Sequence, residues 1–138
     1  MAADEIVSKT LGAALLAIIA AAFTFHFVDQ LWLTCPHNTT TTELTRPFAS
    51  VGGFGFSAAA PQLEDASDIP GNPARSRYLV CEGSQLIGPA HSIHADIAAI
   101  GKGRFSHWGK DFVFSASDNT NPNTNGRRYI AVQPRAVQ

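Results

Sequence analysis

Residues Thr10 to Val28, with the sequence TLGAALLAIIAAAFTFHFV, decide how this chain is organised. The stretch holds 19 residues, none of which is charged, and most are Ala, Leu, Ile or Phe. As an α-helix it extends over roughly 28 Å, close to the thickness of the hydrocarbon core of a bilayer. The sequence therefore predicts a membrane-type helix within residues 1–33, followed by a polar region rich in Gly, Pro, Asn, Ser and Thr.

The apolar segment has three interpretations: a cleaved signal peptide, a retained membrane span, and a helix packed in the centre of a protein polymer. Lys9 and the small residues at 20–22 fit a signal peptide. Asp4 and Glu5 make the preceding residues net negative, which favours a retained span. The alanines within the segment allow close helix packing, so other integral membrane proteins or copies of this chain are expected partners.

The basic residues on either side of the span and the two cysteines predict the compartment in which the polar region lies. Lys9 is the basic residue before the span and Arg46 is the first after it, which weakly favours a cytoplasmic N-terminus. Cys35 and Cys81 both follow the span and share a compartment. Outside the cytoplasm they are expected to form a disulfide, whereas two buried free thiols are the alternative.

The polar region divides into an extended connector with loops at 34–76 and a β-rich domain at 77–138. VGGFGFSAAAP, from residue 51, fits a strand edge or a packed loop. RYLVCEG and QLIGPAH predict a hairpin, and SIHADIAAIG predicts a short helix that stops at Gly101. RFSHWG, DFVFSAS and RRYIAVQP are β-like. The predicted fold is a single N-terminal membrane-type α-helix followed by a small mainly-β domain with one short helix.

Composition and motifs argue against nucleic-acid binding and catalysis. Ten Lys and Arg stand against 11 Asp and Glu, and charged residues make up 15% of the chain, where about 25% is usual. This balance excludes a nucleic-acid binder that works through bulk charge. The sequence has no G-x-S-x-G, no phosphate-cradling glycine loop and no close carboxylate pair in an apolar setting. We therefore expect a protein without enzymatic activity.

Histidines gather around residue 100. HSIHAD contains His91, His94 and Asp96, and His107 follows in SHW, so four possible metal ligands lie within 17 residues. The pair is H-x-x-H without an intervening Glu, and neither cysteine belongs to a C-x-x-C pair. We expect no metal site here, and histidines that form local hydrogen bonds around turns.

The C-terminal region combines aromatic rings with Asn and Arg, the residue types that recognise carbohydrate by stacking and bidentate hydrogen bonds. The candidate ligand-binding residues are Arg104, His107, Trp108, Asn119, Asn125 and Arg127. Residues 99–138 hold six basic and two acidic side chains, an excess of four that suits anionic polysaccharide or phospholipid headgroups. The alternative is a β-domain whose Trp packs in the core.

The runs G-x-GRFSHWG and FS-x-SDN…TNGRRY resemble a small module found at the ends of bacterial polysaccharide-related proteins. The resemblance covers about residues 78 to 130. It implies a bacterial origin and a compact β-rich unit, and it transfers no catalytic residue to this chain.

The apolar segment carries a second resemblance. Ala22, His26 and Trp32 form A-x-x-x-H with a Trp six residues on, which is similar to the bacteriochlorophyll-binding helix of bacterial light-harvesting polypeptides. This resemblance implies that the His26 imidazole ligates the magnesium of bacteriochlorophyll. A histidine at the membrane interface, or bonded to a neighbouring helix, is the alternative interpretation.

The leading functional hypothesis is a non-enzymatic, single-span accessory or structural subunit of an assembly in the bacterial inner membrane. Its β-rich domain would bind partners in the periplasm or outside the cell. Three alternatives stay open: a subunit of a pilin-like helical filament, a membrane-anchored carbohydrate-binding module, and a pigment-binding light-harvesting accessory protein.

Overall fold

The structure, a computed structural model, describes residues 34–36 and 39–134. The chain divides into two compact units, Met1–Thr34 and Cys35–Gln138. The predicted membrane-type helix, with His26 and its proposed pigment, lies outside the described residues. Within the described ranges no helix is long and apolar enough to cross a membrane.

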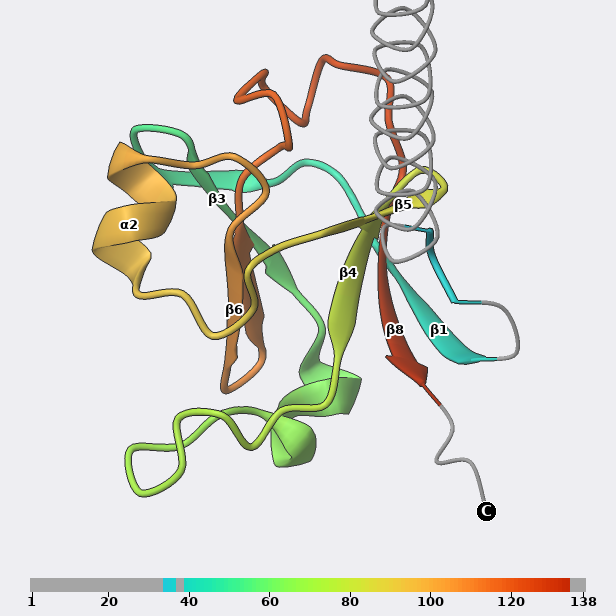
Figure 1. Ribbon diagram of the computed structural model, residues 1–138, viewed down its shortest axis with the longest axis vertical. Coiled ribbons are helices and arrows are strands. Elements are labelled where there is room, and N and C mark those ends of the chain that lie inside the picture. Colours follow the sequence, from blue (N-terminus) through green and yellow to red (C-terminus); the bar gives the residue numbers. More distant parts are fainter. Residues whose placement is uncertain (1–33, 37–38, 135–138) are drawn as a thin grey trace, which may run out of the picture. The chain divides into compact units, whose positions relative to one another are not determined.

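The second unit is a small mainly-β domain with two antiparallel sheets (Figure 1). The first sheet has the order β1 (Thr39–Leu44), β8 (Tyr129–Pro134), β4 (Leu79–Glu82), β5 (Gln85–Ile87). The second has the order β2 (Ala49–Gly52), β3 (Gly55–Ala59), β7 (Asp111–Phe114), β6 (Phe105–Trp108). Its helices are the short 3-10 helix η1 (Pro61–Ala66) and the six-residue α2 (His94–Ala99), which lies beside the second sheet in Figure 1. The predicted mainly-β fold is confirmed at this level.

Several elements lie where local patterns in the sequence predict them. β4 and β5 form the predicted hairpin, with Val80 opposite Ile87 and a turn at Gly83, whose φ is +61°. The predicted short helix is α2, and Gly101 follows it with φ +66°. The Gly101 N–H donates to the Asp96 carbonyl, so the predicted stop residue closes the helix.

Residues 34–76, predicted as connector and loops, supply three of the described strands. β1 pairs with β8 along its whole length, from Thr39 opposite Pro134 to Leu44 opposite Tyr129. β3 pairs with both β2 and β7. The four threonines have the strand preference that was expected, but their pairing partner lies about 90 residues further along the chain. The compact unit therefore begins at Cys35 rather than at residue 77.

One core joins the two sheets, and aromatic rings form its centre. Phe114 of β7 contacts Phe48 at 5.1 Å between ring centroids and Tyr129 of β8 at 4.8 Å. All three rings are buried, and the same cluster includes Val80 of β4. The predicted disulfide between Cys35 and Cys81 is present and ties the start of the unit to β4.

Candidate ligand-binding site

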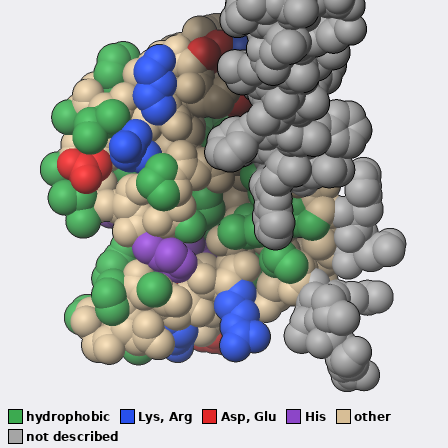
Figure 2. Space-filling view, viewed as in Figure 1, with side chains coloured by type: hydrophobic (Ala, Val, Ile, Leu, Met, Phe, Trp, Pro, Cys, Tyr) green, Lys and Arg blue, Asp and Glu red, His purple; other side chains and the backbone are tan. Residues whose placement is uncertain are grey.

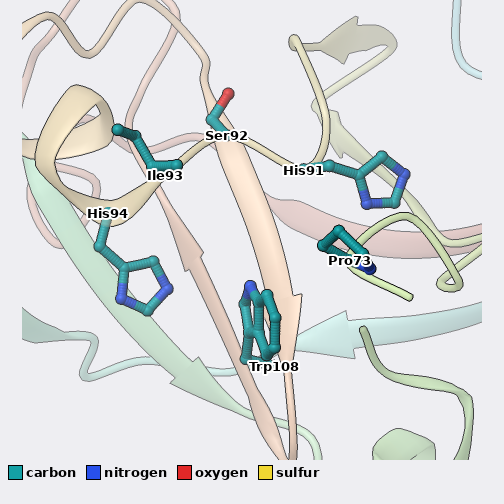
Figure 3. Close-up of a pocket in the computed structure, with 6 residues that line it drawn as sticks. All are labelled: Pro73, His91, Ser92, Ile93, His94 and Trp108. Atoms are coloured by element: carbon teal, nitrogen blue, oxygen red, sulfur yellow. The ribbon is translucent and has the colours of Figure 1, made fainter. Parts of the chain in front are cut away.

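An open pocket of about 260 Å³ lies where three distant segments of the domain meet. These segments are the loop after η1, the turn before α2 with the first residue of α2, and the end of β6. Figure 3 shows the lining residues Pro73, His91, Ser92, Ile93, His94 and Trp108. In Figure 2, histidine side chains reach the surface near the middle of the described face, with hydrophobic side chains on either side.

Trp108 forms the aromatic wall of this pocket. It is the last residue of β6, half-buried, and it pairs with Asp111 across the β6–β7 turn. Figure 3 shows its indole between His94 and Pro73, with the nitrogen-bearing edge turned into the pocket. Trp108 therefore offers a ligand both an apolar ring and an N–H donor, and the ring is the stacking surface expected of a sugar-binding Trp.

His91 is fixed by a buried carboxylate. Its Nδ1 lies 2.8 Å from Oδ2 of Asp68, and Asp68 is only 1% exposed. The other oxygen of Asp68 accepts the Ser76 N–H at 2.8 Å. We assign the Nδ1 proton to the bond with Asp68, since the carboxylate can only accept. Nε2 of His91 is then the nitrogen available to a ligand.

The backbone at His91 is in the left-handed region, with φ +54°. Non-glycine residues rarely adopt this conformation, and such residues are concentrated at functional sites. The following residue anchors the turn, because the Ser92 N–H donates to the Phe105 carbonyl and the Ser92 hydroxyl donates to the Pro89 carbonyl. The imidazole of His91 is thus held in one place by both its backbone and its side chain.

His107, predicted as a ligand-binding residue, lies in the interior behind the pocket. It is 1% exposed, stacks on Phe112 at 4.0 Å between ring centroids, and places Nδ1 2.8 Å from the Ser76 hydroxyl. Its Nε2 has no hydrogen-bond partner among the described residues. Burial lowers the pKa of His107 below its ordinary value of 6.5. His107 therefore supports the pocket as a neutral group.

This lowered pKa predicts a stability that depends on pH. Below about pH 6.5 the unfolded chain takes up a proton at His107 that the folded domain resists, so the free energy of unfolding falls as the pH drops from about 7 to 5. The loss from this one site is at most about 1.4 kcal/mol for each pH unit. Urea unfolding of the wild type and of His107→Gln should show a shallower pH dependence for the variant. His94→Gln is the matched control, and an equal slope in wild type and His107→Gln would contradict the prediction.

Asn125 and Arg127 lie in a different network, around Glu82 at the end of β4. Asn125 Nδ2 donates to the Tyr129 hydroxyl at 2.8 Å, and this hydroxyl donates to Glu82 at 2.6 Å. Arg127 donates to Glu82 at 3.3 Å and to Asp118 at 2.6 Å. Burial raises the pKa of Tyr129, so its hydroxyl remains a donor. These side chains satisfy each other within the domain.

The two remaining candidate residues stabilise the end of α2. Asn119 accepts the Lys102 N–H at 2.6 Å and donates to the Ile100 carbonyl at 3.1 Å. Arg104 donates to the Gly101 carbonyl at 3.0 Å. The structure therefore does not bring the six predicted residues into one surface.

The Glu82 network and Trp108 lie at opposite ends of the β6–β7 hairpin. Trp108 is at the turn of that hairpin, whereas Ser117, which donates to Glu82, follows the far end of β7.

Asp68, which holds His91, was not among the residues predicted from the sequence. This carboxylate follows η1, which carries Glu64 and Asp65, and no local sequence pattern distinguishes it from them.

The pocket's chemistry is that of a binding site for a small polar ligand with an apolar face. Ser92 lines the pocket, but its hydroxyl is engaged with the Pro89 carbonyl.

In comparisons with known proteins, no family model, curated protein or solved structure matches the chain.

Proposed function

We propose that this chain is a non-enzymatic accessory protein whose β domain binds a saccharide in the pocket of Trp108. The observation that carries the proposal is the half-buried indole on the wall of an open pocket, beside an imidazole fixed by a buried carboxylate. A sugar ring stacks its C–H face on an aromatic ring and uses its hydroxyls for directed hydrogen bonds. Trp108 supplies the first contact and His91 the second.

The size and polarity of the pocket support a small ligand. Its volume of about 260 Å³ is near the lower end of pockets that hold small molecules. Pro73 and Ile93 add apolar surface, and Ile93 is 64% exposed. Such a pocket suits one sugar unit at the end or side of a chain. The engaged Ser92 hydroxyl favours binding over acyl transfer, because a nucleophilic serine must bond to its base.

The rest of the chain supports a location at a membrane. The uncharged segment from Thr10 to Val28 is long enough to anchor the protein as a single-span subunit of a bacterial inner-membrane assembly. The Cys35–Cys81 disulfide favours a domain outside the cytoplasm, since disulfides persist in oxidising compartments. In this proposal the domain recognises saccharide at the outer side of that membrane.

Trp108→Ala is expected to weaken saccharide binding by at least about tenfold, because the stacking surface is lost. The measurement is a glycan array with the full chain in mild detergent. Trp108→Phe should retain most of the binding, and Phe54→Ala, which removes an exposed ring outside the pocket, should retain all of it. Binding by no glycan, or equal binding by Trp108→Ala, would exclude the proposal.

A further inference from the structure

We propose that the end of the domain formed by the β2–β3 turn and the turn after α2 docks on the surface of an anionic phospholipid bilayer. The docking tip, as we call this surface, consists of Val51, Phe54, Ile100 and Lys102. This inference rests on the membrane location in the proposed function and is independent of saccharide binding. It assigns a partner to a surface that lies outside the pocket.

Large hydrophobic side chains are exposed together at the docking tip. Val51, Phe54 and Ile100 are 46%, 40% and 45% exposed. The Phe54 N–H donates to the Ala98 carbonyl at 2.9 Å, which joins the β2–β3 turn to α2. A Cβ added at Gly101 would lie 2.9 Å from the Cβ of Phe54, so the backbone after Ile100 passes directly against Phe54. Exposed apolar side chains gathered in this way are typical of a contact site for a protein or a membrane.

Unpaired cations lie beside these apolar side chains. Lys102 is exposed between two buried glycines, and its N–H donates to the Asn119 side chain at 2.6 Å. Neither Lys102 nor Arg104 forms an ion pair with a described residue. Figure 2 shows basic side chains among hydrophobic ones over the region of α2, whose acidic residue is Asp96. Apolar side chains with neighbouring cations suit the headgroup region of an anionic bilayer.

The length of the chain before the domain favours a bilayer as the partner. Six residues separate the uncharged segment, which ends at Val28, from Cys35. A chain of that length reaches at most about 25 Å, so a membrane-anchored domain stays close to lipid. Cys35 joins the domain at the β4–β5 turn, where its N–H donates to the Ser84 carbonyl at 2.8 Å. The turn that holds Lys102 packs against Ile87, at the other end of the three-residue β5.

The docking tip and the aromatic wall of the pocket lie at opposite ends of the second sheet. Phe56, two residues after Phe54, pairs with Phe114 at the end of β7. Trp108 pairs with Asp111 at the start of β7. Contact between the docking tip and lipid therefore turns Trp108 away from the bilayer, where a saccharide in solution can reach it.

The test measures the depth of the docking tip in vesicles. The full chain with Val51→Cys is labelled with nitrobenzoxadiazole and reconstituted with phosphatidylcholine, alone or mixed with phosphatidylglycerol. In the mixed vesicles, doxyl-labelled lipid is expected to quench the label strongly, and iodide in solution to quench it weakly. Glu64→Cys is the matched control, because Glu64 is exposed and lies beyond the opposite end of β3. Its label is expected to show the reverse.

Substitutions in the labelled Val51→Cys chain separate the apolar contribution from the electrostatic one. Phe54→Ser is expected to lose most of the quenching by lipid. Lys102→Gln is expected to lower the equilibrium constant for the bilayer-bound state about fivefold in the mixed vesicles, because one cation near an anionic surface is lost. Lys110→Gln, an exposed lysine at the β6–β7 turn, is the charge control and should change nothing. A thermal unfolding curve confirms that each variant is folded.

The outcomes separate this inference from the proposed function. A chain that stays in the vesicles after an alkaline carbonate wash, but whose label at residue 51 is quenched by iodide alone, would overturn the docking tip and leave the anchor intact. A chain removed by that wash would overturn both. Protection from iodide that grows with the ratio of protein to lipid, without quenching by lipid, would identify a second copy as the partner and overturn the bilayer. Quenching that is equal in both kinds of vesicle and unchanged in Lys102→Gln would overturn the role of the cations.

Discussion

Replacing Cys35 and Cys81 together with alanine is expected to lower the free energy of unfolding of the β domain by about 4 kcal/mol. The two residues are 46 positions apart, and the bridge removes the entropy that this loop has in the unfolded chain. The loop also contains β1 and β3, whose partners β8 and β7 lie far along the sequence. Urea unfolding of the full chain, monitored by near-ultraviolet circular dichroism, measures the change.

Reduction of the wild type provides the control for this prediction. A reducing agent should destabilise the wild-type domain by a similar amount and leave the double-alanine variant unchanged. The Cys81 side chain is fully buried, so the alanine adds a small packing loss that reduction does not cause. A wild type whose unfolding transition is the same with and without reducing agent would contradict the prediction.

Glu82→Ala is expected to lower the free energy of unfolding by about 2–3 kcal/mol, since it leaves a buried donor without an acceptor. Glu82 is 6% exposed and accepts from the Tyr129 hydroxyl at 2.6 Å, from Arg127 and from Ser117. Tyr129 is 1% exposed, so its hydroxyl cannot turn to water after the substitution. Because Ser117 follows β7 and Glu82 ends β4, the same substitution removes a polar link between the two sheets.

The chain offers a matched control in Glu43→Ala. Glu43 also lies in a strand and also pairs with an arginine, Arg128, at 2.8 Å, but both side chains are more than half exposed. Ion pairs at such sites contribute little, because water screens them and their side chains lose entropy. Thermal and urea unfolding should therefore show little change for Glu43→Ala. Equal destabilisation by the two substitutions would contradict the importance of burial at Glu82.

The pocket depends on the same packing that these two predictions test. Trp108 and His107 lie on β6, whose register against β7 is fixed by the buried rings of Phe112 and Phe114. Asp68 lies in a loop whose backbone bonds to β6, with its N–H donating to the His107 carbonyl at 2.8 Å. The pocket is thus a product of how a loop docks on a sheet edge.

Elements whose signals are local follow from the amino-acid sequence alone. The hairpin of β4 and β5 follows from two apolar runs around Gly83, and α2 from the spacing of Ile93, Ile97 and Ile100 before Gly101. The mainly-β class and the pairing of the two cysteines also followed from the sequence. In each case the residues that carry the signal either are neighbours in the chain or, for the cysteines, have a single possible partner.

The pocket and the start of the domain depend on contacts between segments that are far apart in the chain. The strand preference of the threonines in β1 does not specify which strand they pair with. Pairing with β8 is favoured because it buries Leu44, at the end of β1, in the common core. Likewise, three separate segments contribute His91, Trp108 and Asp68, and these segments meet because the loops dock on the sheet. Arg127, which was expected at the same site, bonds to Glu82 instead. Long-range pairing and burial determine such contacts, and residue types close in sequence carry no information about them.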